Sequence, residues 1–335
     1  MPVITAAAGT LARTSPAPRT GEHGELQRAL RLAARAGRAA PVTSPSQDIP
    51  ALSTIDARLV GLAYAPAGAG DPVGSGAWQV PFSLQSVTKV FALALLTAIA
   101  PEAATARFRT DSWAEDFRST VPLDARESLA PNPFTNAGAL VVVDQLMHHH
   151  DDVAAAVAGF ICDQGADIAS PTVPPAGPVT VDEQVAAGEL ANCHRNRALA
   201  HLLAERGLLD HPVPEVLEQY VRQCAVAADC GRTASAAGFL ARGGLLRDGR
   251  RLLSPDQTRR LNALLLTCGA YQQSAAVAVE VGLPVKTGVG GGVLAVAPGR
   301  GTLCVWSPGL DRAGNPAAAL TAAAAFTRSA GLSIF

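Results

Sequence analysis

Lysine is nearly absent from this chain of 335 residues: of its 27 basic residues, only Lys89 and Lys286 are lysines, and the rest are arginines. Aromatic residues are scarce as well, at 4% of the chain, and 27 basic residues nearly balance 28 acidic ones. A chain without excess charge has no broad basic face, so we expect no nucleic-acid partner. No apolar run approaches the roughly 20 residues that cross a bilayer, so we expect no membrane span.

The N-terminus has no basic patch followed by an apolar stretch, so the sequence predicts no secretory leader and a cytoplasmic protein. The six cysteines stand singly, without a C-x-x-C pair. This spacing argues against a zinc site or a redox dithiol and predicts buried free thiols. With 48% hydrophobic side chains, the chain can bury a substantial core, as one large domain or two ordinary ones.

Periodicity of the apolar residues predicts strands near both ends of the chain and helices between them. Strands are expected at 58–64, 77–82, 293–296 and 302–306, and helices at 136–147, 195–206, 216–224, from 254 onward and at 316–329. The expected fold is α/β in the α+β sense: an antiparallel sheet built from both chain ends and flanked by helices, plus an all-helical lobe. The active cleft is expected where the two lobes meet.

Residues 1–40 are predicted to be a flexible N-terminal extension with one short amphipathic helix that ends near Gly37. Residues 41–335 are predicted to be the functional domain. Its sheet lobe would comprise about 45–100 and 270–335, and its helical lobe about 101–269.

The two lysines are the most informative residues of the chain, because an amine can lose its proton and act as a base, which a guanidinium group cannot do. If a helix begins near Ser86, then Ser86 and Lys89 lie one turn apart, and the amine reaches the hydroxyl that it must activate. Burial and the charge of Lys286 would favour a neutral Lys89. S-x-x-K with K-T-G is the signature of serine β-lactamases and penicillin-binding proteins, but their third motif is missing here.

Several segments in one order resemble the serine-dependent glutaminases, amidohydrolases with a β-lactamase-like fold. These segments are 80–91 (VPFSLQSVTKVF), 132–139 (NPFTNAGA), 194–196 (HRN), 261–271 (LNALLLTCGAY) and 282–292 (GLPVKTGVGGG). The resemblance covers nearly the whole chain, from about residue 45 to 320. It implies hydrolysis of L-glutamine to L-glutamate and ammonia through a γ-glutamyl ester of Ser86, with Lys89 as base and without a cofactor or metal.

The resemblance also implies which residues bind the substrate. Backbone N–H groups of Ser86 and Val289 would form the oxyanion hole, Glu189 would face the substrate's ammonium group, and Tyr271 would help to relay the Ser86 proton. The implied substrate-binding set is Ser86, Asn136, Glu189, Asn196, Tyr220, Tyr271 and Val289, with Lys286 in support. The family resemblance further predicts a homo-oligomer, either a dimer or a tetramer.

Some of these residues also have a purely structural interpretation. Asn136 can cap the helix that follows it, and Tyr220 can be an ordinary half-buried aromatic side chain. Residues 288–292 are rich in glycine, but the expected strand after them argues against a phosphate-binding loop, which needs a helix there. The run of three histidines and two aspartates at 148–152 is interpreted as a solvated end between two helices rather than a metal site.

Two departures from the glutaminase pattern fall at the mouth of the expected site. Asp48 precedes Ile49 and Pro50, where these enzymes usually carry a tyrosine that reaches the catalytic serine. Residues 113–118 (WAEDFR) stand in place of the family's Glu-Pro-Ser-Gly segment. Two alternatives to a working glutaminase therefore stay open: another serine amidase or β-lactam-reactive enzyme, and a catalytically weak relative that binds an amino acid as a sensor.

Overall fold

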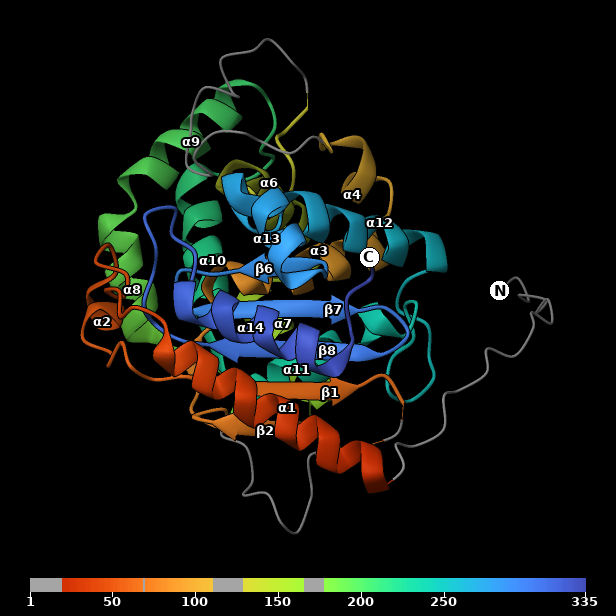
Figure 1. The fold of residues 1–335 in the computed structure, drawn as a ribbon. Helices are drawn as coiled ribbons and strands as arrows, with labels where there is room; N and C mark the ends of the chain where they lie inside the picture. Colours follow the sequence, from red (N-terminus) through yellow and green to blue (C-terminus); the bar gives the residue numbers. More distant parts are fainter. Residues whose placement is uncertain (1–19, 69, 111–128, 166–177) are drawn as a thin grey trace, which may run out of the picture.

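The computed structural model describes residues 20–68, 70–110, 129–165 and 178–335. Its centre is an antiparallel sheet of five strands in the order β2-β1-β8-β7-β6 (Figure 1). These strands are β1 (Gly61–Pro66), β2 (Val73–Gly76), β6 (Val285–Thr287), β7 (Gly292–Ala297) and β8 (Gly301–Trp306). Strand β1 pairs along its length with β8, with Gly61 opposite Trp306. The predicted sheet from both chain ends is confirmed.

Helices cover both faces of this sheet, and alternate strand residues pack into two different cores. In β7, Val293 and Ala295 belong to one core, and Leu294 and Val296 belong to the other. The first core lies under α1 (Thr20–Ala39), α13 (Ser274–Val281) and α14 (Ala317–Ala330), and the second under α11 (Cys230–Ala241), with α7 (Val153–Gly165) packed on α11 (Figure 1). Because both faces are covered, the strands read as nearly continuous apolar runs.

The other described helices are α2 (Pro50–Ser53), α3 (Thr88–Ile99), α4 (Ala103–Ala106), α6 (Asn136–Met147), α8 (Glu183–Asn192), α9 (His194–Glu205), α10 (Val213–Cys224) and α12 (Pro255–Cys268). Helices α2 and α3 fall in the segment predicted to be the sheet lobe, and the rest fall, with α7 and α11, in the segment 101–269 predicted to be the helical lobe. The predicted bounds of α6 are confirmed, as is the capping box at the start of α12, in which Ser254 and Gln257 bond to each other's backbone N–H groups.

Short strands form a second sheet of three strands in the order β3-β5-β4. They are β3 (Phe82–Ser83), β4 (Thr180–Val181) and β5 (Val226–Ala228), so the segment predicted to be all-helical also carries two strands. The strand predicted at 77–82 is wrong over most of its length. There the Val80 N–H donates to the Ala77 carbonyl at 3.2 Å and closes a turn.

Helix α1 has 20 residues and is longer than the short helix that the sequence predicts. Its Leu30 and Ala33 side chains are fully buried in the first core. Residues 1–19, which were predicted to be flexible, lie outside the described part of the chain. So does the segment 113–118, which replaces the family's Glu-Pro-Ser-Gly segment. All six cysteines are free, and all except Cys162 are buried. Among the helices of the described residues, none has the length and apolar character of a membrane span.

Candidate active site

Ser86 lies in a tight turn between β3 and α3. The 3-10 turn η1 (Gln85–Val87) runs directly into α3, so Ser86 and Lys89 are one turn apart. Gln85 has a φ of 49°, in the left-handed region that few non-glycine residues adopt. The Thr88 hydroxyl donates to the Gln85 carbonyl at 2.7 Å, and the Gln223 amide donates in turn to the Thr88 hydroxyl. These bonds hold a strained backbone, which costs about 1–3 kcal/mol and is typical of active sites.

The Lys89 amine is buried between α3 and the start of α6. The side chain is 2% exposed, and Nζ donates to Asn136 Oδ1 at 2.8 Å and to the Phe134 carbonyl at 3.4 Å. Burial lowers the pKa of Lys89 to about 8, against smaller raising effects of Cys224 and Glu189. A pKa near 8 leaves about a tenth of the amine neutral at pH 7, and this fraction can accept a proton.

Asn136 links Lys89 to α9, because Asn136 Nδ2 donates to Asn196 Oδ1 at 2.9 Å. The helix cap is a different residue: Thr135 is the N-cap of α6, and its side chain accepts from the Gly138 N–H. The interpretation of Asn136 as a helix cap is therefore wrong. Its amide group joins two side chains of the site instead.

Lys286 is fully buried on β6, where Nζ donates to the carbonyls of Gly269 at 2.9 Å and of Thr287 at 2.7 Å. Burial, and then the charge of Lys89, lower its pKa well below the usual value. We expected the charge of Lys286 to favour a neutral Lys89. Repulsion between two amines is mutual, but it removes the charge of the amine with the lower pKa, which is Lys286. The more deeply enclosed amine of Lys286 is the one that loses its charge first.

The glycine-rich loop between β6 and β7 packs directly on the Ser86 turn. A methyl group on Gly288 would lie 2.7 Å from the Leu84 carbonyl oxygen and 3.2 Å from the Ser86 nitrogen. One on Gly290 would lie only 1.9 Å from the Ser83 carbonyl oxygen, so these glycines permit the close approach. Val289 lies between them, next to the Ser86 turn. Strand β7 follows, so the loop does not precede the helix that a phosphate-binding loop needs.

Glu189, on α8, is held by the side chain of Gln85. Gln85 Nε2 donates to Glu189 Oε2 at 3.2 Å and to the Ser83 hydroxyl at 3.2 Å. Burial raises the pKa of Glu189 to about 7, opposed by the Gln85 hydrogen bond and by the charge of Lys89. Sequence reasoning missed Gln85. The available signal was its position immediately before the proposed nucleophile.

Both tyrosines of the predicted site are buried. Lys89 Nζ lies 5.8 Å from the ring centre of Tyr220, and Lys286 Nζ lies 4.4 Å from that of Tyr271. Tyr220 is 2% exposed, so it is not the half-buried aromatic of the simpler interpretation, and burial raises its pKa well above the usual value. Its hydroxyl therefore stays protonated. Tyr271 has a φ of 57°, a second left-handed backbone at this site.

A cavity of about 780 Å³ opens beside these groups, a size suited to a small ligand. Four predicted substrate-binding residues line it: Asn136, Glu189, Asn196 and Val289. Asp48, which is exposed, also lines the cavity. Arg195, from the segment 194–196 that resembles glutaminases, and Asp311 also line the cavity, as do Gln272 and Arg312, which the sequence did not point to. The cavity lining does not include Ser86, Lys89, Tyr220 or Tyr271. The groups around Ser86 connect to the lining through Asn136, Gln85 and the glycine-rich loop.

Comparisons with known proteins agree on one family. The family profile described as Glutaminase matches residues 44–335. A glutaminase of Streptomyces coelicolor is 46% identical over 291 residues, which cover 87% of this chain and 92% of the relative. A glutaminase of a Methylobacterium species is 39% identical over 86% of this chain and 91% of its own length.

Solved structures give the same result. The structure of a probable glutaminase, YbaS, superposes with a TM-score of 0.84 at 27% identity, over 93% of this chain and 98% of the other. The structure of Mglu in its glutamate form has a TM-score of 0.81 at 28% identity, over 92% of this chain and 69% of the other.

Proposed function

The chain belongs to the glutaminase family, and on this premise we propose the residues with which it hydrolyses the side-chain amide of L-glutamine. Ser86 is the nucleophile and Lys89 is its base. The observation that carries this assignment is the buried Lys89 amine, one turn from Ser86, with its pKa lowered to about 8. A serine hydroxyl needs such a base before it can attack a carbonyl carbon.

In the first half of the reaction, neutral Lys89 takes the proton of Ser86 while the serine oxygen bonds to the amide carbon of the substrate. The charge that develops on the amide oxygen is stabilised by the backbone N–H groups of Ser86 and Val289, which the close packing of the glycine-rich loop supports. One such donor contributes about 10²–10³ in rate. The carbon–nitrogen bond then breaks, the leaving nitrogen takes the proton from Lys89, with Tyr271 as relay, and ammonia departs.

In the second half, a water molecule attacks the γ-glutamyl ester and gives a proton to Lys89. The bond from carbon to the serine oxygen breaks, the serine recovers its proton, and L-glutamate is released. Serine, lysine and backbone N–H groups supply the nucleophile, the base and the oxyanion donors, so the proposed route uses neither a cofactor nor a metal.

Substrate selection is assigned to the walls of the 780 Å³ cavity. Glu189 faces the ammonium group of glutamine, and the amides of Asn136 and Asn196 with the Tyr220 hydroxyl donate to its carboxylate. The pKa of Glu189, raised to about 7, makes this carboxylate an effective partner above that pH. The related Mglu structure in its glutamate form supports an amino acid as the ligand of this fold.

Ammonia release from L-glutamine tests the assignment. We expect Ser86→Ala to lose at least about 10³ in kcat, because no other hydroxyl replaces the nucleophile. Ser329→Ala is the matched control, since Ser329 is exposed on α14. Turnover in Ser86→Ala within tenfold of the control would show that another group is the nucleophile.

We further propose that the enzyme works in the cytoplasm as a homo-oligomer of two or four subunits. The family resemblance supports this proposal. Light scattering on the purified protein should give a mass of two or four times the 34.2 kDa subunit. A mass of one subunit across the working concentration range would contradict it.

A further inference from the structure

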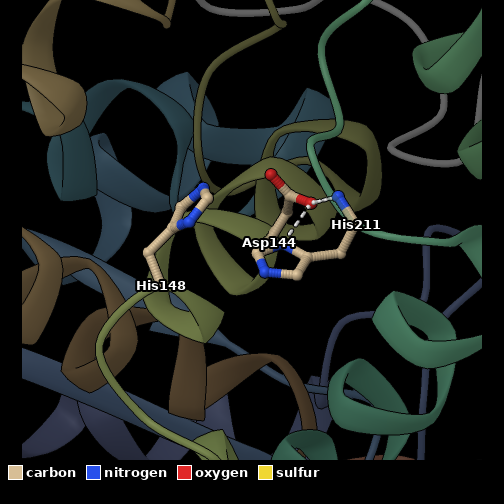
Figure 2. A group of neighbouring side chains, drawn as sticks. All are labelled: Asp144, His148 and His211. Carbon is tan, nitrogen blue, oxygen red and sulfur yellow. Dashed lines mark hydrogen bonds and ion pairs between the residues drawn. The ribbon is translucent and has the colours of Figure 1, made fainter.

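A second cluster of polar side chains lies near the C-terminal end of α6 (Figure 2). Asp144 lies in the last turn of this helix, and His148, four residues later, is its C-cap with a helical backbone, so the two share one face. His211 comes from the connection between α9 and α10. Asp144 is eight residues beyond Asn136, roughly 12 Å along the helix axis. The cluster is therefore separate from the site that holds Lys89.

We propose that Asp144, His148 and His211 bind one divalent transition-metal ion of the zinc class. Each side chain offers one ligand atom, and these three atoms lie within 4.8 Å of one another. Two imidazole nitrogens and one carboxylate oxygen are a ligand set that suits Zn²⁺ and Co²⁺, whereas Mg²⁺ favours oxygen ligands. The sequence interpretation of 148–152 considered only neighbours in the chain and so could not include Asp144 or His211.

The Asp144 carboxylate is already oriented as a metal ligand requires. It is fully buried, its Oδ1 accepts from the backbone N–H groups of Asp210 and His211, each at 2.9 Å, and its Oδ2 accepts from Gln145 Nε2 at 3.0 Å. Ligating carboxylates usually have such partners, which fix their direction. His211 Nδ1 lies 3.1 Å from the same Oδ1 (Figure 2). Two ligands of one tetrahedral zinc ion lie about 3.3 Å apart, so a small movement makes room for the ion in place of the shared proton.

His148 provides the open side of the cluster. Its side chain is 43% exposed, which gives an ion a path from solvent, and its ring centre lies 4.6 Å from that of His211. His148 Nε2 contacts Asp210 Oδ2 at 3.1 Å, so the proposal assigns Nδ1 to the ion. A carboxylate on the second nitrogen of the ring is the usual companion of a metal-binding histidine.

The ion would connect the end of α6 to the segment that leads into α10. Both helices carry residues of the proposed active site, Asn136 at the start of α6 and Tyr220 on α10. Because the cluster contacts none of the proposed catalytic groups, the expected effect of the ion is on thermal stability. An ion that binds only the folded state raises its stability in proportion to the logarithm of the ion concentration.

The test is a titration of the full chain, freed of metal by chelation, with Zn²⁺ and with Co²⁺. We expect one equivalent to bind with a dissociation constant of about 10 μM or below, and Zn²⁺ to raise Tm. His148→Ala and His211→Ala should each weaken binding at least about tenfold. His149→Ala is the matched control, because His149 is exposed, adjacent in sequence and outside the cluster. The Co²⁺ spectrum should lack the charge-transfer band of thiolate ligands, which separates this site from the six cysteines.

Unchanged binding in His148→Ala, or no saturable binding at 1 mM metal (on the order of a hundred times the expected constant), would overturn the proposal. His148→Ala decides the matter if His211→Ala fails to fold, because the His148 side chain is largely exposed. Glutamine turnover is measured in parallel, and we expect it to stay within twofold of the parent in His148→Ala. Loss of the metal site and loss of the Ser86 assignment are thus distinguishable.

Discussion

The two buried lysines lie in regions that meet at the Ser86 turn, and they are held by different kinds of partner. Lys286, on the sheet, donates to two backbone carbonyls, both within 3.0 Å. Lys89, on helix α3, has one short bond, to the side-chain amide of Asn136. A side-chain amide can rotate as the amine gains or loses a proton, whereas the carbonyls beside a strand are fixed. This difference supports the proposal that Lys89 transfers protons, and it favours a role for Lys286 in positioning the backbone at Gly269 and Thr287.

Removing the amine of Lys89 should have the largest effect on turnover. We expect Lys89→Met to lower kcat by about 10³–10⁴, near the upper range for general-base catalysis. The variant should be at least as stable as the parent, because an apolar side chain avoids the desolvation of a buried amine. Thermal unfolding and ammonia release measure the two effects. A variant that kept a tenth of the parent's kcat would remove Lys89 as the base.

Replacing Lys286 tests whether the two amines have different roles. We expect Lys286→Met to lower kcat/KM by about 10- to 100-fold, through displacement of the backbone that Gly269 and Thr287 contribute. The acid limb of the pH profile should stay where it is, because burial is the main cause of the lowered pKa of Lys89 and Lys286 loses its proton first. A shift of that limb by one pH unit or more would show that Lys286 is charged in the pH range where Lys89 titrates.

The pH profile of the parent provides the reference for both variants. Lys89 accepts a proton only when it is neutral, so kcat/KM should rise with pH and level off above about 8. Glu189 should add a second loss below about pH 7, where its carboxylate becomes protonated and KM increases. Initial rates between pH 5.5 and 9.5 (roughly two units on either side of these values) resolve the two limbs. A flat profile across this range would contradict both assignments.

Gln85 connects Glu189 to the Ser86 turn. Its side-chain amide binds Glu189, and its backbone has a left-handed conformation, so two variants are needed to separate the two effects. Gln85→Met removes the amide that holds Glu189, which should raise KM at pH 7 by about tenfold and move the KM limb toward higher pH. Gln85→Gly removes the same amide but relaxes the backbone at φ 49°. Equal KM values in the two variants would assign the effect to the amide. A normal KM in Gln85→Met would remove Gln85 from substrate positioning.

Asp48 should have the smallest effect, since it lies exposed at the edge of the cavity. The family membership does not favour the catalytically weak alternative, so we expect turnover in the parent and a gain of no more than about tenfold in Asp48→Tyr, the size of one added hydrogen bond. Steady-state ammonia release by both proteins tests this. A silent parent restored by Asp48→Tyr would mean that one residue switches off or redirects a glutaminase site.

Local patterns predicted those parts of the fold that depend on neighbours in the chain. The helix at Asn136–Met147 follows from apolar periodicity, and the start of α12 follows from its capping box. Strand β5 has only three residues, Val226–Ala228, too few for any period to be read from the sequence. The turn at Ala77–Val80 was missed because its residues also fit a strand pattern.

The contacts of the site were beyond sequence reasoning for a different reason. Lys89 and Asn136 are 47 residues apart in the sequence, and Gln85 and Glu189 are 104 apart. No local sequence pattern can predict hydrogen bonds over such separations. The resemblance to glutaminases indicated most of the residues that make these hydrogen bonds, but it did not indicate how they are arranged. It did not single out Gln85, although this residue directly precedes the proposed nucleophile, and a left-handed backbone at a residue other than glycine leaves no mark on composition.

The pairing of β1 with β8 has a consequence for how the protein is made. Gly61 finds its partner only when Trp306 has been synthesised, and such distant contacts slow folding. Ser86 and Lys89 leave the ribosome long before the glycine-rich loop that must pack on them. A nascent chain therefore carries the proposed nucleophile and base for most of its synthesis without a closed site around them. We expect hydrolysis of free glutamine to begin only after the strands from both ends of the chain have paired.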